Sequence, residues 1–135
     1  MFEVATTVKF DEERIRSLLC GAFEGGSDYW MGKRQYQLPE GITLSDFREQ
    51  GKFTIPDDYN PPYLLVPFHE GCSIAVVDDE DQYRGVLNRE SMVRGLQLMA
   101  DKYPNHFADF MQENDDATTS DVFLQLSVFG ELIFG

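Results

Sequence analysis

The sequence has no apolar run long enough to cross a lipid bilayer, and its first residues lack the features of a secretion signal. A membrane-spanning helix needs about 18 consecutive apolar residues, and polar residues interrupt the apolar stretches of this chain well before that length. Met1, Phe2, Glu3 and Val4 provide neither the basic beginning nor the apolar core of a signal peptide. We therefore expect a cytoplasmic protein without a membrane segment.

Cysteine and histidine are scarce, which limits the metal and redox chemistry of the chain. Cys20 and Cys72 are the only cysteines, and in a reducing compartment we expect thiols rather than a disulfide. The segment His69-Glu70-Gly71-Cys72 gathers three candidate ligands, but metal sites usually need a second group at a defined spacing. His106, the other histidine, lies on a different predicted element. We therefore predict a turn at 69–72, and neither a metal nor a cofactor.

Catalytic and ligand-binding patterns are also missing. Cys20 follows Leu18 and Leu19 on a predicted core-facing helix, where a thiol is inert. The acidic run 78–81 lacks the alternating ligands and central glycine of a calcium-binding EF-hand loop. The segment Glu24-Gly25-Gly26-Ser27 follows a predicted helix and has no lysine of the phosphate-binding type. The sequence predicts a protein that is not an enzyme.

Basic residues are few: 11 lysines and arginines face 24 aspartates and glutamates, which gives a net charge of −13. Direct binding of nucleic acid needs a basic surface, and so does attachment to an anionic membrane. The acidic excess lies in two windows without Lys or Arg, 53–83 and 103–135, and the rest of the chain is neutral. The acids of these windows are Asp57, Asp58, Glu70, Asp78, Asp79, Glu80, Asp81, Asp109, Glu113, Asp115, Asp116, Asp121 and Glu131. If they share one face, they form a negative surface that attracts basic partners; otherwise they only keep the protein soluble.

Apolar and aromatic side chains are plentiful enough for a folded core. The chain is 42% hydrophobic and contains 11 phenylalanines, unlike a disordered sequence. Its 135 residues match the commonest size of one domain. We predict a single α+β domain over 1–135, with a small antiparallel sheet packed against about four helices and an apolar C-terminal helix in the core.

Alternating and helical patterns predict where these elements lie. Strands are expected at 2–9, within 27–38, at 63–68, and in a hairpin over 72–87 whose tip is the acidic run 78–81. Helices are expected from Asp11 to Gly25-Gly26, at 43–50, after the N-cap Asn88, at 105–114, and at 119–134 with Thr118 and Asp121 as a capping pair.

The predicted helix 119–134 is apolar around almost its whole circumference. Such a helix is normally buried on all sides. We favour a central position in the core, and the alternative is a homodimer contact through 119–134. A second open alternative concerns Tyr29, Trp30, Tyr59 and Tyr63, which suit either a recognition surface or the edge of a core.

Residues 18–30 read LLCGAFEGGSDYW, and the segment from Asp115 to Gly135 contains DVFLQ, from Asp121 to Gln125, and FGE, from Phe129 to Glu131. These two stretches resemble the N-terminal and C-terminal ends of a group of short proteins encoded by bacteriophages and prophages. We assign no activity to this group. The resemblance implies an accessory role inside an infected bacterium. It transfers no catalytic residues.

These observations lead to one functional hypothesis and two alternatives. We hypothesise an acidic phage protein that inhibits a bacterial defence system, of the anti-CRISPR or anti-restriction type, by imitating nucleic acid on a basic surface of a host effector. The expected partner-binding residues are Asp57, Asp58, Asp78, Asp79, Glu80, Asp81, Asp115 and Asp116. One alternative is a self-associating structural or regulatory phage protein. The other is a small hydrolase or metal enzyme, which would need His69, Glu70, Cys72 or His106 to converge.

Overall fold

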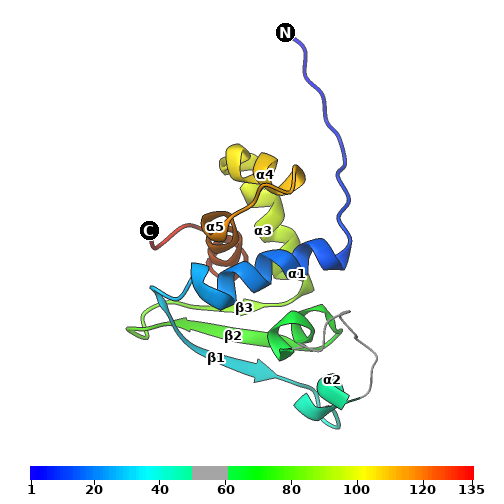
Figure 1. Cartoon of the computed structure of the whole chain (residues 1–135), viewed down its shortest axis with the longest axis vertical. Coiled ribbons are helices and arrows are strands. Elements are labelled where there is room, and N and C mark those ends of the chain that lie inside the picture. Colours follow the sequence, from blue (N-terminus) through cyan, green and yellow to red (C-terminus); the bar gives the residue numbers. More distant parts are fainter. Residues whose placement is uncertain (50–60) are drawn as a thin grey trace.

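The structure, a computed structural model, describes residues 1–49 and 61–135, and it confirms the predicted α+β class (Figure 1). Within those residues, one antiparallel sheet has the strand order β1-β2-β3. Its strands are β1 (Met31–Gln37), β2 (Ser73–Asp78) and β3 (Arg84–Leu87). The α-helices of the same residues are α1 (Glu12–Gly21), α2 (Leu44–Glu49), α3 (Arg89–Lys102), α4 (Pro104–Met111) and α5 (Ala117–Phe129).

Helices cover one face of the sheet, and among the described residues the other face combines exposed side chains with the buried Val77. Helices α1, α3, α4 and α5 gather on one side of the sheet (Figure 1). Ile74 of β2 is fully buried and lies opposite Tyr36 of β1 and Leu87 of β3. Alternation along a strand places Val76 on the same face and exposes Val86 on the other. The 72–87 hairpin predicted from the sequence is therefore present.

Helix α5 is the central element of the core, as its composition predicts. Every residue from Thr119 to Val128 is buried, so helix and sheet cover it from several sides. Close approach on the α3 side depends on Gly95, where an added Cβ would lie 2.1 Å from Ser127 Oγ. This burial leaves little of α5 for the alternative contact between two copies through 119–134.

The ends of α5 differ from the prediction. The helix begins after Asp116, whose carboxylate accepts a 2.9 Å hydrogen bond from the Thr119 backbone N–H, so Asp116 and not Thr118 is the N-cap. It ends at Phe129, because Gly130 adopts a left-handed conformation with φ 76°. Residues 131–134, predicted as helix, instead fold back as a tail. Asp121 therefore does not take part in capping α5, and its carboxylate is available for other contacts.

Other helix boundaries agree with the predicted caps. Asn88 and Ser91 form a capping box at the start of α3, whose Met92 and Met99 are buried. Thr43 precedes α2, and its backbone N–H donates to Asp46 over 2.9 Å. The predicted helix reached residue 50, which lies outside the described residues.

Two predicted strands are wrong. Residues 63–68 lie in two 3-10 turns, Pro62–Leu64 and Val66–Phe68, since each turn contains a proline, Pro62 or Pro67, that lacks the N–H donor a strand requires. Residues 2–9 are exposed and have no regular structure. The reason is the anchor that follows them: the Phe10 ring packs 4.7 Å from the ring of Phe110, on the helical side of the molecule and away from the sheet.

None of the helices in the described ranges combines the length and apolar character that crossing a membrane requires.

Candidate functional site

The tip of the β2–β3 hairpin contains four of the predicted binding residues, and it divides them into two kinds. Asp79, Glu80 and Asp81 are exposed, whereas Asp78 is buried. The Asp78 carboxylate accepts hydrogen bonds from the backbone N–H groups of Gln82 and Tyr83, at 2.7 and 2.6 Å, and of Glu80 at 3.3 Å. Asp78 therefore shapes the turn that presents its three neighbours.

The pKa of Asp78 reflects this role. Burial acts to raise the pKa of the carboxyl group, but the backbone hydrogen bonds from Tyr83, Gln82 and Glu80 outweigh it and hold the pKa below its ordinary value. Asp78 is consequently ionised in the folded protein at neutral pH, and its charge is used within the turn.

A second buried carboxylate, that of Asp121 on α5, holds the turn between α1 and β1. One oxygen accepts hydrogen bonds from Ser27 Oγ at 2.8 Å and Trp30 Nε1 at 2.7 Å. The other accepts from the Tyr29 hydroxyl at 2.5 Å and from Gln125 Nε2 at 3.1 Å. Four neutral donors thus satisfy a carboxylate that would otherwise be costly to bury.

Tyr29 links this buried network to the surface. Its side chain is 54% exposed, while its hydroxyl donates inward to Asp121. Partial burial of the hydroxyl and the hydrogen bond to Asp121 raise the pKa of Tyr29 to about 12. The ring is therefore an aromatic surface group held in one position by its own hydroxyl.

Gln125, one helical turn after Asp121, fixes the C-terminal tail. Its Oε1 accepts hydrogen bonds of 2.9 Å from the backbone N–H groups of both Ile133 and Phe134, and its Nε2 donates to the Phe134 carbonyl. The Phe134 ring then stacks on Trp30, with ring planes 2° apart and centroids 5.4 Å apart. The 27–30 turn and the tail are thus packed against each other and against α5.

The hairpin tip joins the same assembly. The Asp79 backbone N–H donates to the Trp30 carbonyl over 2.8 Å, and the Tyr83 ring packs edge-on against Phe134 at 5.7 Å. In Figure 1 the hairpin tip, the turn between α1 and β1, and the C-terminus lie on the same side of the molecule.

We call this side of the molecule the acidic end. Its exposed carboxylates belong to Asp28, Asp79, Glu80, Asp81 and Glu131. Tyr29 and Tyr83 are exposed among them, at 54% and 41%. Arg84 forms a 2.8 Å ion pair with Asp81, and Lys33 is exposed on β1 opposite Val77. Acidic groups therefore outnumber basic ones on a surface that also offers two aromatic rings.

The other predicted binding residues lie elsewhere. Asp116 caps α5, and hydrogen bonds led by the one from Thr119 lower the pKa of its carboxyl group. Asp115 lies 3.5 Å from the Arg14 guanidinium and is mostly covered. Both stand at the start of α5, where Asp115 makes an ion pair and Asp116 caps the helix. Asp57 and Asp58 lie outside the described residues.

The remaining candidate groups do not form a reactive site among the described residues. His106 contacts the Thr119 hydroxyl at 2.9 Å, and His69 packs against the Phe47 ring, so the two histidines serve different elements. Burial raises the pKa of both Cys20 and Cys72, which keeps them as thiols. In residues 1–49 and 61–135, no three His, Cys, Asp or Glu side chains are grouped so that they could hold a metal ion.

The four aromatic residues that suited either a recognition surface or the edge of a core do not behave alike. Tyr29 is exposed, but Trp30 and Tyr63 are buried, and Tyr59 lies outside the described residues. Sequence reasoning missed Asp28, Tyr83 and Glu131, which tertiary packing alone brings together. It also missed the buried network, although a signal was there: Asp121 and Gln125 are polar residues spaced i, i+4 on one side of an apolar helix.

The two stretches on which the phage resemblance rests meet in this assembly, since Ser27, Tyr29 and Trp30 bind Asp121. No protein-family description matches the sequence, and neither curated proteins nor solved structures show a significant similarity to this chain.

Proposed function

We propose that this protein is a binding protein without catalytic activity, and that its acidic end occupies a basic surface on a partner protein. The observation that carries the proposal is the convergence of Asp28, Glu131 and the 79–81 tip around exposed Tyr29 and Tyr83. Tyr rings are common anchors of protein interfaces, because they bury a large area at a small cost in conformational entropy.

The acidic end is built on two rigid turns, and this favours it as the binding surface over the other acidic regions. The Asp78 turn fixes the backbone of residues 80–83, and the Asp121 network fixes the turn that contains Asp28 and Tyr29. Carboxylates held in fixed positions can replace phosphates on a basic channel with a smaller loss of conformational entropy on binding. The excess negative charge of the whole chain, −13, would speed the encounter with such a partner.

We propose further that the partner is a nucleic-acid-binding effector of bacterial defence, and that the protein inhibits it. Proteins that bind nucleic acid have a basic surface of the required kind. The resemblance to phage-encoded proteins points to a partner inside an infected bacterium. The binding surface in this proposal comprises Asp79, Glu80 and Asp81, with Asp28 and Glu131 added. Asp78, Asp115 and Asp116 act within the fold.

The test uses two triple variants with equal change in net charge. In the first, Asp79, Glu80 and Asp81 become lysine; in the second, exposed Glu13, Glu40 and Asp101 become lysine. Both variants, and the wild type, are used to capture defence effectors from bacterial lysate and to displace DNA from the captured effector. We expect the first variant to lose capture and displacement, and the second to keep both. Equal behaviour of the two variants would reject the acidic end as the binding surface.

A further inference from the structure

The N-terminal segment has the sequence of a strand but no strand partner within the described part of the chain. Residues 1–9 are exposed, and Phe2 and Val4 are almost completely so, at 103% and 97%. No backbone–backbone hydrogen bond joins residues 1–10 to any other described residue. Unpaired N–H and C=O groups on an extended, β-branched segment are a template for pairing with another chain.

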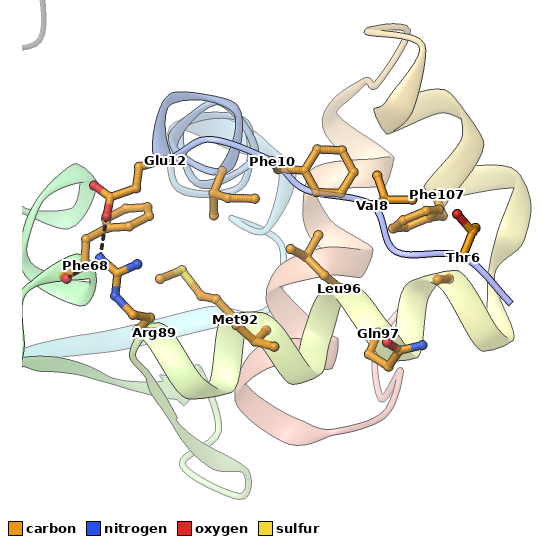
Figure 2. A pocket seen from close by; sticks show the side chains of 13 residues that line it. Thr6, Val8, Phe10, Glu12, Phe68, Arg89, Met92, Leu96, Gln97 and Phe107 are labelled. Carbon is orange, nitrogen blue, oxygen red and sulfur yellow. Dashed lines mark hydrogen bonds and ion pairs between the residues drawn. The ribbon is translucent and has the colours of Figure 1, made fainter.

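The segment has one apolar side. Alternation along an extended chain puts Phe2, Val4, Thr6, Val8 and Phe10 on one side, and Glu3, Ala5, Thr7 and Lys9 on the other. Thr6, Val8 and Phe10 face a groove between α1, α3 and α4 (Figure 2). Phe2 and Val4 continue the same apolar side past Thr6, the last residue of the segment to line that groove.

The groove under the segment is only partly filled. It encloses a cavity of about 430 Å³ with Met92, Val93 and Leu96 of α3 in its wall. Figure 2 shows Val8 and Phe10 beside Leu96 and Phe107, with Arg89 and Glu12 paired at the far end. Val93 is 63% exposed although it is an apolar residue of a long helix. The groove therefore has room for additional apolar side chains next to Val8 and Phe10.

The segment is complementary to itself in one antiparallel register. With Thr6 opposite Thr6 of a second copy, Phe2 lies opposite Phe10, Glu3 opposite Lys9, and Val4 opposite Val8. Each copy then contributes one acid and one base to two opposite-charge pairs, on the side away from the groove. Cross-strand pairs of aromatic, β-branched and oppositely charged residues are those that stabilise antiparallel strands. The pairing has the twofold symmetry of most protein dimers.

We propose that residues 2–10 pair in this register with the same residues of a second copy, and that the protein is a homodimer through its N-terminal segments. A two-stranded ribbon alone is marginally stable in water. In the proposed dimer, the apolar side of the ribbon covers the groove of each copy. Val4 and Phe2 of the second copy lie beside Val8 and Phe10 of the first and extend over the cavity next to Val93. The dimer contact is thus separate from both α5 and the acidic end.

Charge exchange tests the register without disturbing the folded body, because Glu3 and Lys9 are exposed. Glu3→Lys turns both cross-strand charge pairs into like-charge pairs, and Lys9→Glu does the same. We expect each single variant to raise the dimer Kd by about tenfold. The double variant Glu3→Lys/Lys9→Glu restores opposite charges and should return Kd to within about threefold of wild type. Sedimentation equilibrium from about 1 to 300 µM covers the affinities usual for small interfaces.

Cysteine cross-linking tests the same register by distance. Thr6→Cys would place two cysteines opposite each other, at a Cα separation of about 5 Å that permits a disulfide. Glu3→Cys would place them roughly 20 Å apart, six residues along the ribbon, and is the matched control. The wild type, treated identically, controls for Cys20 and Cys72. We expect a covalent dimer from Thr6→Cys alone.

A wild type that stays monomeric over the whole concentration range would overturn the proposal. So would a dimer that Glu3→Lys leaves intact, that the double variant does not restore, or that Glu3→Cys cross-links as readily as Thr6→Cys.

Discussion

The carboxylate of Asp121 accepts a 2.7 Å hydrogen bond from Trp30 Nε1, and both side chains are buried. This contact joins the central helix to the turn between α1 and β1 across 91 positions of sequence. It explains how an acidic residue can lie inside the core of a small domain. It also connects the core with the exposed acidic end, because the same turn contains Asp28 and Tyr29.

Asp121→Ala should destabilise the protein strongly. The substitution leaves the Trp30 indole N–H and the Ser27 hydroxyl without their acceptor, and unsatisfied buried donors cost about 1–3 kcal/mol. We expect a loss of about 3 kcal/mol in the free energy of unfolding, measured by urea denaturation. Asp28→Ala, at an exposed position of the same turn, is the control and should change stability by less than about 0.5 kcal/mol. Comparable losses in the two variants would contradict the role given to Asp121.

Tyr29 should ionise later than an ordinary tyrosine as the pH rises. Its pKa is raised from 10.0 to about 12, so its contribution to stability is complete below pH 10 and is lost as the pH rises through 12. Ultraviolet titration of tyrosinate should show a group that ionises late in the wild type and is missing in Tyr29→Phe. Identical late titration in the wild type and Tyr29→Phe would contradict this assignment.

Asp78→Asn should loosen the hairpin tip and alter the response to acid. Because folding lowers the pKa of Asp78 from 3.8, the stability that it contributes is present above that value and is lost as the pH falls through the lower folded pKa. The variant should therefore lose less stability than wild type below pH 3.8, from a lower starting point. Hydrogen exchange should also accelerate at the amides of Gln82 and Tyr83, which donate to this carboxylate. Unchanged exchange at both amides would argue against the turn-forming role.

Gly95→Ala should disrupt the contact between α3 and α5. The added Cβ would meet both Ser127 Oγ at 2.1 Å and the Ser127 backbone nitrogen at 2.9 Å, so the two helices must separate. We expect a loss of about 1–3 kcal/mol by thermal or urea unfolding. Arg94→Ala, on the exposed side of the same helix, should be nearly neutral.

Much of the fold follows from local sequence patterns. The Asn88 cap, the 72–87 hairpin and the burial of α5 were each predictable, because capping, alternation and an all-round apolar helix are properties of neighbouring residues. The strand predicted at 2–9 failed for the opposite reason. A strand needs a partner as well as a pattern, and Phe10 anchors this segment on α4, away from the sheet.

The candidate site was less accessible to sequence reasoning. The acidic tip 78–81 is visible as a run, but nothing local shows that Asp78 turns inward while its neighbours remain exposed. Likewise, Asp28 and Glu131 are about a hundred residues apart in sequence, and the tail that contains Glu131 is held by hydrogen bonds that the Ile133 and Phe134 backbone N–H groups donate to Gln125. Grouping acids by sequence window therefore merged the exposed acids of the hairpin tip and the tail with Asp115 and Asp116, which make an ion pair and cap α5.

The most direct test of the central claim is the rate of association with a captured effector at low and at physiological salt. The lysine triple at 79–81 should associate about tenfold more slowly than wild type at low salt, with a weaker dependence on salt, because these carboxylates steer the encounter. The control triple at Glu13, Glu40 and Asp101 should keep most of the wild-type rate. Equal slowing of both triples would mean that net charge alone governs binding, and would contradict a binding surface at the acidic end.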